Sequence, residues 1–286
     1  MTYQKELNSA RHLAREAGYL IMKYRDGELE VELKEQEEPV TVADRAASEL
    51  IVGGLSAAFP DDVVISEENA DDLRRLDAER VWYVDPIDGT RDFIKGRDGF
   101  AVMIGLTVSH APVIGVVYAP VSDRMFWADT GHAWLEFPGC EEPRQIAASS
   151  VNRMSDIRLV ASRSNRSGTI DAVKSALGIT EEYNVGSVGL KLALIALGER
   201  DLYVNPSSRC KSWDTCAPEA LLRAAGGALT DVHGDPLRYD LQDLGRRSGL
   251  VASNGLVHEA VIEHMRPLFA ASRPTGNSPD RPGELT

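Results

Sequence analysis

The sequence predicts an α/β protein in two halves, an α+β half followed by an α/β half. Between residues 100 and 137 the chain carries apolar runs of strand length with only turns between them, which is typical of strands in an α+β unit. From residue 157 on, such runs alternate with runs of helical spacing, which indicates an α/β arrangement. A polar stretch from Pro138 to Ser150 separates the two patterns. We therefore expect one domain over residues 1–145 and a second over residues 146–271.

The spacing of apolar residues predicts the elements of the first half. Apolar residues recur every three or four positions from Leu7 to Tyr24 and again after Thr41, which predicts two amphipathic helices. Apolar runs bounded by turn residues predict strands at residues 63–66, 81–85, 100–108, 113–118, 125–128 and 133–137. The charged residues 69–80 are expected to form an exposed connection.

In the second half, strands and helices are expected to alternate. The strands are predicted at residues 157–161, 183–185, 202–204 and 250–252, and the helices at residues 169–177, 190–197, 214–225 and 257–269. Residues 272–286 contain several Pro and Gly residues and have no apolar pattern, so we expect a disordered tail.

Composition and charge narrow the range of partners. The 286 residues are 43% hydrophobic and 26% charged, which is ordinary for a globular protein. The apolar runs are too short to span a bilayer, and no signal peptide is recognisable at the N-terminus, so we expect a cytoplasmic protein with no membrane partner. A formal net charge of −13 disfavours a nucleic acid polymer, but it is compatible with a small anionic substrate.

The residues after the strand at 81–85 suggest a metal site. The apolar strand leads directly into Asp85-Pro-Ile-Asp88, and Pro86 is expected to end it. Two aspartates with the carbonyl of Ile87 between them could supply the oxygen ligands that Mg²⁺ prefers. An ordinary Asp-rich turn is the alternative interpretation.

The next two residues suggest that phosphate binds at the same place. Gly89 has no Cβ, so the backbone there can approach a ligand closely. A helix that begins at Gly89 and Thr90 would direct its first NH groups at that ligand, and a helix N-terminus favours phosphate.

Three further acidic positions each stand at the edge of an expected element. Asp44 follows Thr41 as in a capping box, so it either stabilises the helix start or directs its carboxylate at the central stretch. Glu67 and Glu68 follow a β-branched strand, and they are either metal ligands or solvated surface residues. Asp214 stands at or near a helix start, where an N-cap is the alternative role.

Taken together, these local sequences resemble one family. They occur in the order Asp44, Glu67-Glu68, Asp85-Pro-Ile-Asp-Gly-Thr90 and Trp213-Asp-Thr-Cys-Ala217. This order resembles the signature of the inositol monophosphatase superfamily, the lithium-sensitive, Mg²⁺-dependent phosphatases, over nearly the whole chain. The resemblance implies a layered αβαβα sandwich and inhibition by Li⁺.

The resemblance also implies a role for each matching residue. Asp44 and Thr90 would orient and deprotonate the attacking water, and the NH groups of Gly89 and Thr90 would hold phosphate oxygens. Phosphoryl transfer depends chiefly on such positioning and on charge neutralisation. Two or three Mg²⁺ ions would be held by Glu67, Asp85, the carbonyl of Ile87, Asp88 and Asp214.

A more detailed resemblance points to one branch of this superfamily. Gly89-Thr-Arg-Asp-Phe-Ile-Lys95 and Cys210–Glu219 resemble the 3'(2'),5'-bisphosphate nucleotidases, including the CysQ-like type. This implies hydrolysis of 3'-phosphoadenosine 5'-phosphate to AMP and phosphate, in sulfate assimilation. Ser162, Ser187 and Lys191 would shape the nucleotide pocket, with Lys191 at the second phosphate. Asn165 stands where this branch often has His.

Two alternative functions stay open, and so does the oligomeric state. An inositol monophosphatase, or a phosphatase for a sugar phosphate or NADP(H), would keep the same metal chemistry. A non-catalytic sensor of Mg²⁺ or nucleotide would keep the fold, but it would have no need of the water-activating pair Asp44 and Thr90. A homodimer is compatible with every interpretation.

Overall fold

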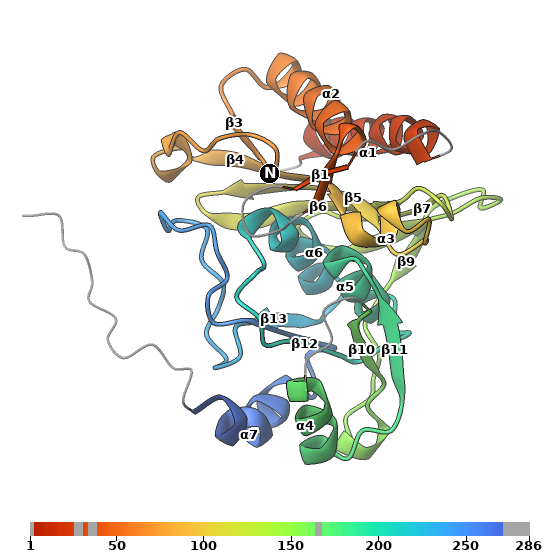
Figure 1. The fold of residues 1–286 in the computed structure, drawn as a ribbon, viewed down its shortest axis with the longest axis vertical. Coiled ribbons are helices and arrows are strands. Elements are labelled where there is room, and N and C mark those ends of the chain that lie inside the picture. The colour runs from red at the N-terminus through yellow and green to blue at the C-terminus, as the bar shows by residue number, and fades with distance from the viewer. Residues whose placement is uncertain (1–2, 26–30, 34–38, 164–167, 271–286) are drawn as a thin grey trace, which may run out of the picture.

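Helices and sheets alternate in five layers (Figure 1). The structure is a computed structural model that describes residues 3–25, 31–33, 39–163 and 168–270. From one side to the other, the layers are α1 with α2, a seven-stranded sheet, α5 with α6, a five-stranded sheet, and α4 with α7. The expected αβαβα sandwich is therefore confirmed.

The first half forms the larger sheet and the helices on its outer face. Helices α1 (Gln4–Arg25) and α2 (Val42–Ala58) pack their apolar residues against this sheet in one core cluster. In the sheet, β3 runs parallel to β4 and each later strand is antiparallel to its neighbour. The strand order is β3 (Val63–Ser66), β4 (Arg80–Asp88), β5 (Ala101–Val108), β6 (Ala111–Ala119), β7 (Arg124–Ala128), β8 (Ala133–Glu136) and β9 (Arg144–Ile146). Strands β1 (Val31–Leu33) and β2 (Pro39–Thr41) form a separate pair.

The second half forms the smaller, mixed sheet. Strand β10 runs parallel to β11 and β12, whereas β14 is antiparallel to β12 and β13. The strand order is β11 (Glu182–Val185), β10 (Leu159–Ser162), β12 (Leu202–Asn205), β14 (Leu250–Ser253) and β13 (Ala228–Thr230). Helices α4 (Gly168–Leu177) and α7 (His258–Phe269) cover its outer face (Figure 1).

Helices α5 (Val188–Ala196) and α6 (Ser212–Ala224) lie between the two sheets (Figure 1). Two glycines that pair across β5 and β6, Gly105 and Gly115, let α6 approach the larger sheet closely. A Cβ added to Gly105 would lie 2.6 Å from the backbone nitrogen of Ala217, and one added to Gly115 would overlap the Ala217 carbonyl oxygen. This close packing places the first turn of α6 beside the end of β4.

Two expectations for the chain before α3 (Thr90–Ile94) are wrong. Strand β4 continues through Pro86 to Asp88. The pairing with β5 shifts register between Asp85 and Asp88, so no regular ladder hydrogen bond is required from Pro86, which has no NH group. Residues 69–80 are not simply exposed, because Arg75 is fully buried. Its guanidinium donates to Asp71 and to the carbonyls of Leu241 and Gln242, so it holds two distant loops together.

Some expectations remain untested. The tail at residues 272–286 and Asn165 lie outside the described residues. The division into two domains also stays a prediction. Within the described residues, no helix combines the length and the apolar character that crossing a membrane requires.

Candidate metal and phosphate site

A cavity of about 470 Å³ opens where the end of β4 meets the first turns of α3, α5 and α6. Most of the residues that the sequence singles out contribute to its wall. Arg91, Asn205, Arg209 and Lys211 line it as well. The predicted site residues in the lining are Glu67, Asp85, Ile87, Asp88, Gly89, Thr90, Ser162 and Asp214.

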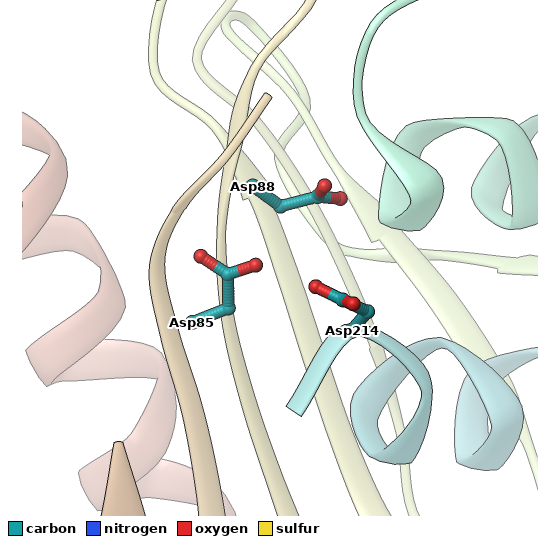
Figure 2. Close-up of side chains that lie close together, drawn as sticks. All are labelled: Asp85, Asp88 and Asp214. Carbon is teal, nitrogen blue, oxygen red and sulfur yellow. The ribbon is translucent and has the colours of Figure 1, made fainter. Parts of the chain in front are cut away.

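Three aspartates from distant parts of the chain converge in this cavity. Figure 2 shows Asp85 and Asp88 on the end of β4 and Asp214 on the first turn of α6, with their carboxylates directed toward one another. One oxygen from each lies within 4.8 Å of the others. Buried carboxylates at such separations repel one another, and a divalent cation with oxygen ligands removes that repulsion. The residues present therefore fit a site for a divalent cation.

The electrostatics of Asp85 support the same conclusion. The carboxyl group is fully buried, and burial raises its pKa well above the ordinary value. The nearby charges of Glu67, Asp88 and Asp214 raise this pKa further. Without a cation, the folded protein therefore holds Asp85 in its protonated form to a higher pH than the unfolded chain does.

In the metal-free protein, Asp85 is expected to make the fold less stable as the pH rises. A carboxyl group whose pKa is raised by folding opposes folding once it ionises, so the loss of stability begins near about pH 4 and grows until the pH passes the raised pKa. Mg²⁺ should remove this penalty by pairing with the ionised carboxylates. Thermal unfolding between about pH 4 and pH 8, in EDTA and in Mg²⁺, measures both effects. Equal melting temperatures in EDTA and in Mg²⁺ at neutral pH would contradict the presence of a metal site.

Asp88 is oriented by the start of α5. Its Oδ2 accepts hydrogen bonds from Ser187 Oγ at 2.5 Å and from the backbone NH of Gly189 at 2.7 Å. Ser187 is the N-cap of α5 and also accepts a hydrogen bond from the NH of Leu190. Burial raises the pKa of Asp88, and the positive charge of Lys191 and these hydrogen bonds partly offset this rise. Ser187 therefore contacts Asp88. It is not among the described residues that line the cavity.

Asp44 fulfils both of the roles that the sequence left open. Its Oδ2 accepts hydrogen bonds from the backbone NH of Thr41 at 2.7 Å and from Thr41 Oγ1 at 2.6 Å, as in a capping box. Its Oδ1 lies 3.5 Å from Thr90 Oγ1, which also donates to the carbonyl of Ile87 at 3.0 Å. The cap thus fixes one oxygen and directs the other at Thr90.

The N-cap interpretation of Asp214 is wrong. The N-cap of α6 is Lys211, and Asp214 is the third residue of the helix. The backbone NH of Lys211 donates to Asp214 Oδ2 at 2.6 Å, so the carboxylate is held at the helix start and still faces the cavity. Glu67 follows β3 directly, and its backbone NH donates to the carbonyl of Val84 at 3.1 Å, which fixes this residue beside β4.

The backbone at Gly89 requires glycine, whereas the phosphate contact predicted there stays a prediction. Gly89 precedes α3 with a positive φ of 99°, and a Cβ there would lie 2.7 Å from the carbonyl oxygen of Gly99. Both facts require glycine. Ser162 lies at the end of β10 and lines the same cavity.

Lys191 does not take the position expected from the sequence. Its side chain is fully buried and does not line the cavity. Its Nζ donates to the carbonyls of Gly186 and Ser187. These contacts do not support the expected contact with a second phosphate, which stays a prediction.

One ion pair at the site carried little signal in the sequence. Asp92 is buried, and its Oδ2 accepts a hydrogen bond from the guanidinium of Arg163 at 2.7 Å, which joins α3 to the end of β10. Room for this carboxylate exists because Gly99 and Gly186 have no side chains: a Cβ on either would overlap or crowd Asp92. Only the tertiary fold brings these two glycines together.

Comparison with known sequences shows the family to which the chain belongs. A profile described as "Inositol monophosphatase family" matches residues 3–268. The chain belongs to the inositol monophosphatase family.

Two curated relatives within this family carry the same name. The 3'(2'),5'-bisphosphate nucleotidase CysQ of Escherichia coli (strain K12) is 38% identical over 238 residues, which are 82% of this chain and 93% of that protein. The protein of the same name from Haemophilus influenzae is 30% identical over 239 residues, covering 83% and 88% of the two chains.

Solved structures of the family have the same fold. An IMPase from Thermotoga maritima superposes with a TM-score of 0.78 at 25% identity, over 93% of this chain and 98% of that one. CysQ from Bacteroides thetaiotaomicron superposes with a TM-score of 0.75 at 29% identity, over 88% and 98% of the chains.

Proposed function

We propose that this chain is a Mg²⁺-dependent phosphatase that removes the 3'-phosphate of 3'-phosphoadenosine 5'-phosphate, giving AMP and phosphate. The observation that carries the proposal is the convergence of Asp85, Asp88 and Asp214 beside the Asp44–Thr90 contact. The substrate follows from the name of the CysQ relatives, which are up to 38% identical to the chain.

Two or three Mg²⁺ ions would be held by carboxylates and one carbonyl. The ligands would be Glu67, Asp85, the carbonyl of Ile87, Asp88 and Asp214. When bound, the metal would neutralise phosphate charge and lower the pKa of water. The same carboxylates would hold the metal close to the NH groups of Gly89 and Thr90, which would bind oxygens of the transferred phosphate.

Thr90 and Asp44 would activate the water. The Thr90 hydroxyl already lies 3.5 Å from Asp44 Oδ1, so a proton from the attacking water could pass through this hydroxyl to the carboxylate. Asp44 is buried and held at its other oxygen by Thr41, which keeps Oδ1 aligned. No covalent nucleophile is needed in this scheme.

Positively charged side chains other than Lys191 would recognise the 5'-phosphate. Arg209 and Lys211 line the cavity on the side that the second half contributes, and Trp213 lies next to them in the lining. Positive charge in this part of the cavity favours a substrate that carries two phosphates. A homodimer and a cytoplasmic location stay predictions.

A panel of phosphorylated substrates tests this assignment. With Mg²⁺, we expect phosphate release from 3'-phosphoadenosine 5'-phosphate with a kcat/KM at least about tenfold above that for inositol 1-phosphate, fructose 1,6-bisphosphate or NADP, because a tenfold preference needs only about 1.4 kcal/mol of extra transition-state binding. EDTA should abolish release. A preference for inositol 1-phosphate would assign the chain to the other activity within the family. If the chain bound nucleotide without hydrolysing any phosphate, the sensor hypothesis would replace ours.

A further inference from the structure

Lys191 is a charged residue in an apolar layer between the two sheets. Its side chain is fully buried, and its Nζ lies 5.1 Å from the ring centroid of Tyr203. Burying an ammonium group costs free energy unless the group is hydrogen-bonded or paired. Here Nζ donates to the carbonyl oxygens of Gly186 at 2.6 Å and Ser187 at 2.7 Å. The buried charge is therefore used to hold one short backbone segment.

That backbone segment is the turn that leads into α5, and it also holds Asp88. Ser187 Oγ and the NH of Gly189, on either side of the helix start, donate to Asp88 Oδ2. Ser187 thus connects both sets of contacts, because its carbonyl accepts a hydrogen bond from Lys191 while its hydroxyl donates one to Asp88.

The turn has little room to move. The NH of Ser187 donates to the carbonyl of Gly99 at 2.8 Å. A Cβ on Gly186 would lie 2.5 Å from Asp92 Oδ2 and 2.6 Å from the Gly99 carbonyl oxygen. On the other side of the turn, the Lys191 ammonium donates to the two successive carbonyls. A loss of this group would remove a charge-assisted hydrogen bond from each carbonyl. The Ser187 carbonyl would keep the longer bond from the backbone NH of Lys191 at 3.3 Å, and the turn would shift to recover the lost contacts.

We propose that Lys191 is a positioning residue, whose buried ammonium fixes the Gly186–Ser187 turn and thereby orients Asp88 for binding a divalent cation. This role rests on the proposed function only in taking Asp88 as a metal ligand. A positioning role differs from direct contact with a substrate phosphate in two ways. A positioning Lys191 affects the turnover of every substrate equally, and it affects metal binding even when no substrate is present.

Calorimetric titration of the substrate-free protein with Mg²⁺ tests this role directly. Lys191→Met replaces the side chain by an unbranched one that is one atom shorter and has no charge. For this variant we expect metal affinity to fall about 10- to 100-fold, the range typical of groups that orient metal ligands. Ile195→Val serves as a matched control, because Ile195 is a buried apolar residue of the same helix. It should change thermal stability slightly and metal affinity not at all.

Lys191→Gln keeps the test valid if the methionine variant does not fold. Its amide can donate to one of the two carbonyls, so we expect a metal affinity between those of the wild type and Lys191→Met. A folded variant of either kind that binds Mg²⁺ as tightly as the wild type would overturn the proposal.

The two possible roles of Lys191 also differ in substrate dependence. With saturating Mg²⁺, positioning predicts the same fold-loss of kcat/KM for 3'-phosphoadenosine 5'-phosphate and for adenosine 3'-monophosphate, which lacks the 5'-phosphate. A loss confined to the bisphosphate would instead mean direct contact with the second phosphate, and it would refute positioning. Inactivity of the wild type toward every phosphate ester would refute the proposed function, but the metal titration would still decide the role of Lys191.

Discussion

Replacing Asp85 by asparagine is expected to lower kcat by about a thousandfold or more, because several kcal/mol of transition-state stabilisation depend on the metal that this carboxylate would hold. Asparagine has nearly the same shape, so the cavity should remain intact. The remaining carboxylates, Asp88 and Asp214, would still attract a cation but with one negative charge fewer. Steady-state phosphate release at several Mg²⁺ concentrations measures the effect.

The same substitution is expected to make the metal-free protein more stable. Burial and the charges of Glu67, Asp88 and Asp214 all raise the pKa of Asp85, so its ionised form opposes folding at neutral pH. Asparagine removes that charge. Thermal unfolding in EDTA should therefore show a higher melting temperature for Asp85→Asn than for the wild type, while activity is lost.

A matched control is available on the surface. Asp61 is exposed in the turn before β3, and Asp61→Asn should change neither kcat nor the melting temperature in EDTA. If Asp85→Asn kept more than about a tenth of the wild-type kcat, Asp85 would not be an essential metal ligand.

Thr90→Ala should lower kcat by about 100-fold or more while Mg²⁺ affinity stays within a factor of about three, because proton transfer by a positioned group contributes about 10²- to 10⁴-fold. The side chain removed here is the hydroxyl 3.5 Å from Asp44 Oδ1 and 3.0 Å from the carbonyl of Ile87. The Thr90 backbone, with its NH at the start of α3, would remain. Single-turnover kinetics and metal titration separate the two effects.

Thr90→Ser is the control for that experiment. Serine keeps the hydroxyl and removes only a methyl group, so we expect at least about a third of the wild-type kcat, whereas a general loss of packing would affect both variants alike. Equal activity of Thr90→Ala and the wild type would show that the hydroxyl takes no part in water activation.

Local sequence indicated that several acidic residues would lie close together, for a physical reason. Glu67 follows β3 directly, and Asp85 and Asp88 lie at the end of β4. Side chains at the end of a buried strand lie at the edge of its sheet. The two strands are neighbours in the sheet, so the acids come together. Asp214 comes from another part of the chain, and its place beside them could be inferred only through the family resemblance.

The buried charged residues could not be predicted in the same way. Asp92 and Arg75 look like surface residues in the sequence, because charged side chains are rarely fully buried, and Lys191 is expected in the cavity. Their burial depends on partners from distant segments, such as Arg163 for Asp92 and the Leu241 carbonyl for Arg75. Neither partner can be read from spacing along the chain.

The paired glycines beneath α6 have a consequence for how the protein tolerates sequence change. Gly105 and Gly115 set the distance between the helix and the strands, and this distance in turn sets how far Asp214 stands from Asp85 and Asp88. One extra methyl group at either glycine would wedge the helix away from the sheet and widen the gap that a single small cation must bridge. The catalytic capacity of the molecule therefore depends on two positions that contribute no atom to the cavity wall.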